Sequence, residues 1–162
     1  MRSVLFVCTA NICRSPMAMG LMRLRVAEEP QDWRIESAGI FAQPGYPTAY
    51  NTLEVLQQRG IDLSEYSSRP FSRQMVEDFN LILTMERNQR EALRAAFPQY
   101  GGKIFMLSQM VGNRVNDIVD PIGGPLVDFE ETAREIEQIL EKGHVRIRKL
   151  AAGGTTASLS YR

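Results

Sequence analysis

The feature that most constrains the fold is an alternation of short β-type segments with stretches that carry apolar residues at helical spacing. Residues 3–8 are apolar almost without interruption, which is typical of a strand buried on both faces of a parallel sheet. The same pattern predicts strands at 33–37, 80–85 and 103–107, and helices from Ser15 onward and at 47–60, 72–78, 88–97 and 128–150. Strands separated by helices predict a doubly wound, three-layer α/β/α domain.

The length of 162 residues suits one domain, and no internal repeat or linker divides the chain. A chain of this size buries roughly 70% of its unfolded surface, so it needs neither disulfides nor a metal for stability. We expect the domain to span residues 1–150. The small and polar residues of 151–162 are typical of a flexible C-terminal tail.

Charge and composition exclude several classes of protein. Nineteen basic and nineteen acidic side chains give a formal net charge of zero, which argues against a nucleic-acid binder. The apolar runs are far shorter than the roughly 20 residues that cross a membrane, and no signal-peptide cleavage site follows the first of them. The sequence therefore predicts a cytoplasmic protein without membrane or nucleic-acid partners.

Cysteine and histidine counts restrict the chemistry further. Cys8 and Cys13 cannot build a disulfide framework or, without other thiols, a zinc site. His144 is the single histidine, which excludes a two-histidine metal motif and weakens any Ser-His or Cys-His mechanism. We expect no metal and no cofactor.

Residues 8–15 join the first strand to a helix, at the sheet edge where doubly wound domains bind ligands. Free backbone N–H groups and the positive end of the helix dipole meet there, which favours an anion. Thr9 and Ala10 are small enough for close approach, and Asn11 tolerates the left-handed conformation of an amide nest. Arg14 adds a planar set of donors suited to phosphate oxygens.

Cys8 lies at the mouth of this predicted anion site. The helix dipole and Arg14 favour its thiolate, and a thiolate facing phosphate is placed to attack phosphorus. Ser15 can cap the helix and donate a hydrogen bond to the sulfur. The alternative to a catalytic site is a buried cysteine at the end of a strand and an unrelated surface arginine. The context of the C-x5-R spacing argues against this alternative, because a strand precedes it and a Ser-Pro helix start follows it.

The segment 7–16, VCTANICRSP, resembles the active-site loop of the low-molecular-weight protein tyrosine phosphatases. The resemblance continues in order through residues 36–39, the strand ending at Met85, and Asp120-Pro121, and covers residues 1 to about 150. It implies a four-stranded parallel sheet, a phosphocysteine mechanism and no cofactor. It also implies contacts to phosphate from Thr9, Ala10, Asn11, Ile12, Cys13, Arg14 and Ser15.

The reaction needs a group that protonates the leaving oxygen and later activates water. Taken alone, Asp120 in the Pro- and Gly-rich segment 119–125 would more often be structural, but the resemblance implies that it is the general acid. Asp117 has no such support, and His144 is expected on the far helix.

Three further roles follow from the resemblance. Asn11 and Ser37 are expected to support the loop from below by hydrogen bonding. Cys13 either fills space in the loop or traps oxidised Cys8 as a disulfide, which would protect the nucleophile from irreversible oxidation. The family precedent favours the trap.

The residues that bear on substrate preference favour different substrates. Ile122 stands where members acting on phosphotyrosine often carry an aromatic residue, no tryptophan follows Gly39, and Asn80 replaces a frequent aspartate. These departures resemble the branch of the family that removes phosphate from arginine. Ile12 in the loop argues the other way, because that branch is associated with threonine there. We therefore expect a phosphorylated protein or peptide substrate carrying phosphotyrosine, with phosphate and other oxyanions as inhibitors.

Two other classes remain as alternatives. Arsenate reductases with this loop relay electrons through two further cysteines, and none follows Cys13. A non-catalytic phosphate-binding or phosphocarrier module would have no need of Asp120 beside Arg14.

Overall fold

A computed structural model of the chain describes residues 1–154. Its centre is a four-stranded sheet in the order β2-β1-β3-β4, built from β1 (Arg2–Cys8), β2 (Trp33–Gly39), β3 (Leu81–Thr84) and β4 (Ile104–Met106). Every neighbouring pair is parallel. The predicted strands and the doubly wound α/β class are confirmed.

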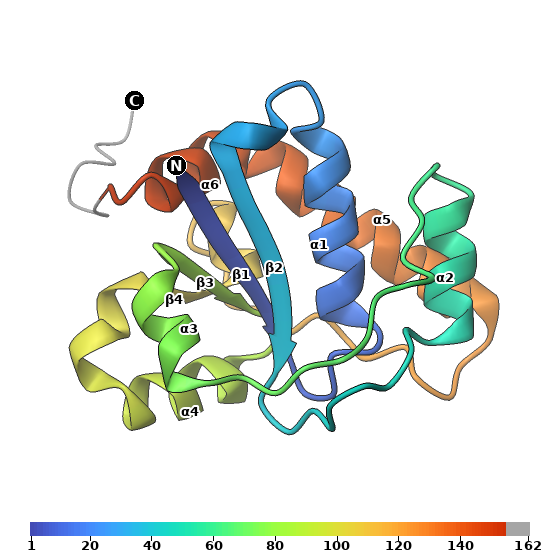
Figure 1. Ribbon diagram of the computed structural model, residues 1–162, viewed down its shortest axis with the longest axis horizontal. Coiled ribbons are helices and arrows are strands. Elements are labelled where there is room, and N and C mark those ends of the chain that lie inside the picture. Colours follow the sequence, from blue (N-terminus) through green and yellow to red (C-terminus); the bar gives the residue numbers. More distant parts are fainter. Residues whose placement is uncertain (155–162) are drawn as a thin grey trace.

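Helices cover both faces of the sheet (Figure 1), as three layers require. One face carries α1 (Arg14–Arg25), α2 (Tyr50–Gln57), α5 (Leu126–Lys142) and α6 (His144–Ala151). The other face carries α3 (Arg73–Asp78) and α4 (Arg87–Ala96). Short 3-10 helices lie at Pro30–Asp32, Pro98–Lys103 and Leu107–Met110. No helix within residues 1–154 is long and apolar enough to cross a membrane.

The side chains of β1 alternate between two hydrophobic clusters. Val4 and Phe6 pack into the larger cluster, with α1 and α5, while Leu5 and Val7 pack into the smaller one. All four are fully buried. This two-sided burial is the reason why the strand is an uninterrupted apolar run.

Three predicted helix starts are wrong. The last long helix begins at Leu126, not Asp128, and the Asp128 carbonyl accepts a hydrogen bond from the Thr132 hydroxyl within the helix. Ser15 does not cap α1, which already begins at Arg14 without a side-chain cap. The helix expected from Pro47 begins at Tyr50.

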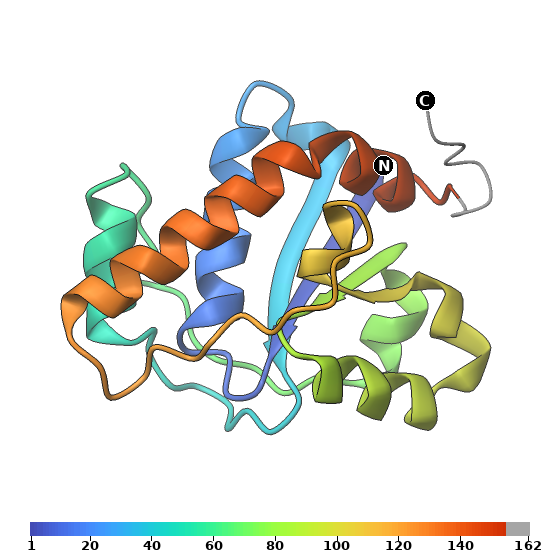
Figure 2. The same ribbon diagram turned by 180° about the vertical axis from the view of Figure 1, so that it is seen from behind.

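The expected single helix to Leu150 is interrupted at Gly143. A Cβ atom there would lie 2.7 Å from the Cβ of Met110, so the close approach of the two segments requires glycine. Figure 2 shows α5 crossing the sheet and α6 continuing towards the amino end of β1. Ala151, assigned to the tail by sequence, is still helical and buried, and residues 155–162 lie outside the described part.

The strand order reverses at β1, because β2 pairs with one of its edges and β3 with the other. The carboxyl ends of all three strands point to the same side of the sheet, so the loops that follow them lie together (Figure 1). Such a switch point is where open α/β sheets bind ligands.

Gly39 ends β2 against the loop that follows β1. A Cβ atom there would lie 2.6 Å from the Thr9 carbonyl oxygen and 2.9 Å from the Asn11 nitrogen. Because both contacts are to backbone, we expect Gly39→Ala to lower the free energy of unfolding by about 1–3 kcal/mol. Gly102→Ala is the control, since its Cβ would meet nothing within 4 Å. Equal denaturant midpoints for the two variants would contradict this explanation.

Candidate active site

Cys8 lies at the carboxyl end of β1, directly below the loop that leads into α1. Its sulfur is 2.9 Å from the Ser15 hydroxyl oxygen and accepts a hydrogen bond of 3.3 Å from the Asn11 N–H. The Cys8 side chain is buried, so its sulfur is held in one position. The structure thus brings together the cysteine and the serine that the sequence pattern paired.

The loop above Cys8 leaves backbone donors free. Within residues 1–154, the N–H groups of Ala10, Ile12 and Cys13 donate to no other protein group. The carbonyls of Thr9 and Ile12 instead accept hydrogen bonds from Phe41 and Ala49 in the next loop. Free N–H groups at a helix start form an anion-binding nest.

Asn11 holds this loop through its side chain. Its φ of 58° is left-handed, as predicted. Its amide nitrogen donates to the hydroxyls of Ser15, at 2.8 Å, and Ser37, at 2.9 Å. Its amide oxygen accepts from the Tyr66 hydroxyl at 2.9 Å and the Arg69 N–H at 3.0 Å. The side chain therefore satisfies all four of its hydrogen bonds, which stabilises the strained conformation.

Tyr66 and Arg69 are support residues that sequence reasoning missed. The Tyr66 hydroxyl is 2.6 Å from the Ser37 hydroxyl, and the Arg69 Nε donates to the Ser37 carbonyl at 2.9 Å. Arg69 also forms an ion pair with Glu36 at 3.0 Å. Both residues lie in the segment before α3, whose pairing with the end of β2 has no local sequence signal.

Arg14 is buried, with 2% of its side chain exposed, so it is no surface cation. Its Nη1 donates to Glu86 Oε1 at 2.6 Å and to the Ile118 carbonyl at 2.7 Å. Its Nη2 lies 3.6 Å from Asp120 Oδ2. The guanidinium thus connects the start of α1 with the segment that carries Asp120. Glu86, the N-cap of α4, was also missed by sequence reasoning.

Asp120 is positioned by its own loop. Its Oδ1 accepts from the Ile122 N–H at 3.1 Å, while Oδ2 faces Arg14. Asp117 points elsewhere and accepts from the Arg87 N–H at 2.8 Å. His144, on α6, accepts a hydrogen bond from Arg25. Of these three candidates for proton transfer, only Asp120 reaches the loop that contains Cys8.

Cys13 is a free, buried thiol at the N-cap of α1. Burial, followed by the nearby charge of Asp120, raises the pKa of Cys13 to about 12. Cys13 therefore keeps its proton at neutral pH, which makes it a poor nucleophile.

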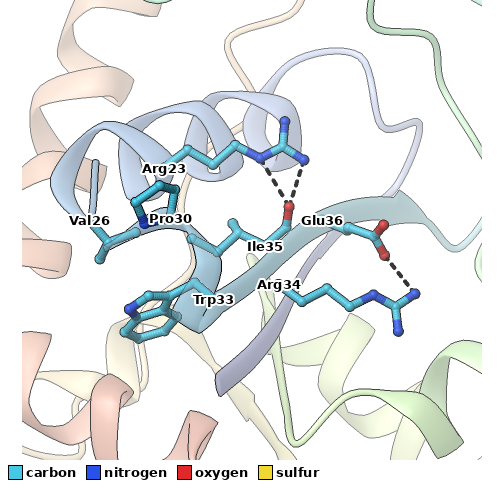
Figure 3. Close-up of a pocket in the computed structure, with 7 residues that line it drawn as sticks. All are labelled: Arg23, Val26, Pro30, Trp33, Arg34, Ile35 and Glu36. Atoms are coloured by element: carbon cyan, nitrogen blue, oxygen red, sulfur yellow. Dashed lines mark hydrogen bonds and ion pairs between the residues drawn. The ribbon is translucent and has the colours of Figure 1, made fainter. Parts of the chain in front are cut away.

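A separate hollow of about 380 Å³ lies along the outer edge of β2 (Figure 3). Arg23 reaches across from α1, and its Nε and Nη2 donate to the Ile35 carbonyl at 3.0 and 2.6 Å. This contact occupies a backbone acceptor that an edge strand would otherwise expose. Neither cysteine nor Asp120 lines this hollow, so it is separate from the candidate active site.

Fold and site together define a class: a doubly wound α/β protein with a cysteine and an arginine on one anion-binding loop and an aspartate facing that loop. The model of the family described as low molecular weight phosphotyrosine protein phosphatase matches residues 3–152. The chain belongs to this family, and the family expectation from sequence is confirmed.

Individual relatives agree with this assignment. A protein-arginine-phosphatase of Bacillus subtilis is 32% identical, over 90% of this chain and 97% of the relative. A probable low molecular weight protein-tyrosine-phosphatase, EpsP, of Ralstonia nicotianae is 35% identical, over 92% of this chain and 98% of the relative.

Solved structures are similar as well. A crystal structure of a YwlE mutant from Bacillus subtilis superposes with a TM-score of 0.86 at 30% identity, covering 92% of this chain and all of that one. The crystal structure of the low molecular weight protein tyrosine phosphatase from T. tengcongensis superposes with a TM-score of 0.84 at 35% identity. It covers 90% of this chain and 99% of that one.

The raised pKa of Cys13 predicts slow alkylation. In a Cys8→Ser background, we expect iodoacetamide at pH 8 to label Cys13 at least about a hundredfold more slowly in folded than in unfolded protein. The rate should keep rising with pH up to about 12. Asp120→Asn removes a charge that raises this pKa, so labelling at pH 9 should be faster. A rate that levels off near pH 9 in the folded protein would contradict the assignment.

Proposed function

We propose that this protein hydrolyses phosphotyrosine in proteins or peptides through a phosphocysteine intermediate on Cys8. The observation that carries the proposal is the placement of the Cys8 sulfur under a loop with free N–H groups, beside Arg14. Such donors bind the phosphoryl oxygens and stabilise the charge that develops on them in the transition state. Phosphate and other oxyanions should compete for the same nest.

The first chemical step transfers the phosphoryl group. The Cys8 thiolate attacks phosphorus, an S–P bond forms, and the bond from phosphorus to the leaving oxygen breaks. Asp120 gives its proton to that oxygen. Arg14, held by Glu86 and the Ile118 carbonyl, contacts the phosphoryl oxygens with its remaining donors.

The second step releases phosphate. Asp120, now a carboxylate, accepts a proton from water as the water oxygen attacks phosphorus, and the S–P bond breaks. The Ser15 hydroxyl, 2.9 Å from the sulfur, donates to the thiolate that leaves. A solved YwlE arginine phosphatase mutant carries a phosphorylated active-site serine, which supports a phosphoenzyme intermediate in this family.

The preference for phosphotyrosine rests on the walls of the site. Ile12 packs against the core with its side chain, in the loop itself. The Phe41 N–H donates to the Thr9 carbonyl, and Tyr50 follows Ala49, whose N–H donates to the Ile12 carbonyl. The side chains of Phe41 and Tyr50 are both 79% exposed. Apolar and aromatic walls suit an aromatic ring better than a charged guanidino group.

Protein arginine phosphatase is the second candidate. It is favoured by the Bacillus subtilis relative, which is named for that activity and aligns over 97% of its length. The segment 122–124 after Asp120-Pro121, which lacks an aromatic side chain, also favours it.

Cys13 has a proposed role in oxidation. Peroxide converts the Cys8 thiolate to a sulfenic acid, and the Cys13 thiol then condenses with it to form a disulfide and water. The raised pKa keeps the Cys13 thiol protonated, so the disulfide forms more slowly than it would from a thiolate. A cysteine nucleophile works in a reducing compartment, so we place the protein in the cytoplasm.

Two substitutions test the mechanism. Cys8→Ser should abolish turnover but still bind phosphate, because the loop amides and Arg14 remain. Asp120→Asn should lower kcat on phosphotyrosine by about 10²- to 10⁴-fold, and less on para-nitrophenyl phosphate, whose leaving group needs little protonation. Asp78→Asn on α3 is the matched control. Full activity of Cys8→Ser would exclude this mechanism.

A side-by-side measurement of kcat/KM on phosphotyrosine and phosphoarginine peptides tests the substrate. We expect the wild-type protein to prefer phosphotyrosine. Ile12→Thr should shift the ratio towards phosphoarginine by about tenfold or more, because a small change in a pocket wall has effects of this size. A wild-type preference for phosphoarginine would transfer the assignment to the second candidate.

A further inference from the structure

Gln89, on the first turn of α4, uses both ends of its buried amide near the active site. It is 5% exposed. Its Oε1 accepts from the N–H groups of Met85, at 3.0 Å, and Glu86, at 2.9 Å. Its Nε2 donates to the Thr9 hydroxyl at 3.0 Å. Gln89 therefore joins the turn between β3 and α4 to Thr9 in the phosphate-binding loop.

The same turn holds the other parts of the site. Glu86 binds Arg14, and the Met85 carbonyl accepts from the Ile118 N–H at 2.9 Å. The Arg87 N–H donates to Asp117 at 2.8 Å. Residues 117 and 118 lead directly into Asp120. The nucleophile loop and the segment that carries the acid are thus fastened to one turn, and Gln89 makes the connection to Thr9.

We propose that Gln89 is a positioning residue for the phosphate-binding loop, acting through the Thr9 hydroxyl. The inference rests on the proposed phosphatase function. Gln89 is too buried behind the loop to touch substrate, and it acts by limiting the rotation of the Thr9 backbone.

The backbone geometry at Thr9 explains why a side-chain bond matters there. The Thr9 carbonyl accepts from Phe41 at 2.9 Å, and the next residue, Ala10, begins the run of free N–H groups. Fixing both the hydroxyl and the carbonyl of Thr9 fixes the direction of the following peptide. Donors aimed in advance bind an oxyanion without reorganisation.

The test combines Thr9→Val, Gln89→Met and the double variant. Thr9→Ser keeps the hydroxyl and is the conservative rescue, while Gln74→Met on the exposed face of α3 is the matched glutamine control. We measure kcat and KM on para-nitrophenyl phosphate, the inhibition constant of inorganic phosphate, phosphate binding by calorimetry, and unfolding by denaturant.

We expect Thr9→Val and Gln89→Met each to raise KM and the phosphate inhibition constant by about five- to thirtyfold, the effect of losing a buried hydrogen bond. Thr9→Ser, which keeps the hydroxyl, should recover most of the phosphate affinity lost in Thr9→Val, and Gln74→Met should stay within about twofold of wild type. The double variant should bind phosphate no more weakly than Gln89→Met alone, since each change already removes the hydrogen bond between Gln89 and Thr9. A purely structural role would lower the denaturant midpoint without changing phosphate binding by the folded protein.

Two results would overturn the proposal. One is a folded Gln89→Met variant with wild-type KM and phosphate inhibition constant, and the other is a double variant whose effects multiply. If the wild-type protein lacks phosphatase activity, the proposed function fails, but calorimetry still measures phosphate binding. A change in phosphate affinity for Gln89→Met would then retain the positioning role.

Discussion

Arg14 is almost fully removed from water, and a buried guanidinium is tolerated only when acceptors surround it. Those acceptors come from separate parts of the chain: Glu86 before α4, the Ile118 carbonyl, and the carboxylate of Asp120. Satisfying one charge therefore brings two further loops to the carboxyl end of β1, the turn before α4 and the segment with Ile118 and Asp120. The rest of the active end depends on this contact, because it sets the distance between the acid and the nucleophile loop.

Much of this arrangement could be predicted from local sequence. An apolar run buried on both faces predicts β1, and its alternation with helical segments predicts the doubly wound class. The left-handed conformation at Asn11 and the anion site follow from small residues before a helix start. Helix boundaries were less accurate. The helix expected from Asp128 begins at Leu126, and Gly143 interrupts it because of a contact with distant Met110.

The supporting residues could not be found in the same way. Tyr66, Arg69 and Gln89 act on the loop from positions 55 to 80 residues away along the chain. Each is an ordinary polar or aromatic residue in its local context, and Gln89 also satisfies the rules for a helix start. Only the folding of the chain around a parallel sheet, with its long crossover connections, makes them neighbours.

The hydrogen bonds beneath the nucleophile have a consequence for how the protein responds to acidity. Asn11, Ser15 and Ser37, which connect the loop to β2, contain no group that gains or loses a proton in water near neutrality. The connection between the loop and β2 therefore does not depend on the protonation state of these three side chains. It can stay unchanged while Cys8 and Asp120 gain and lose protons during the reaction.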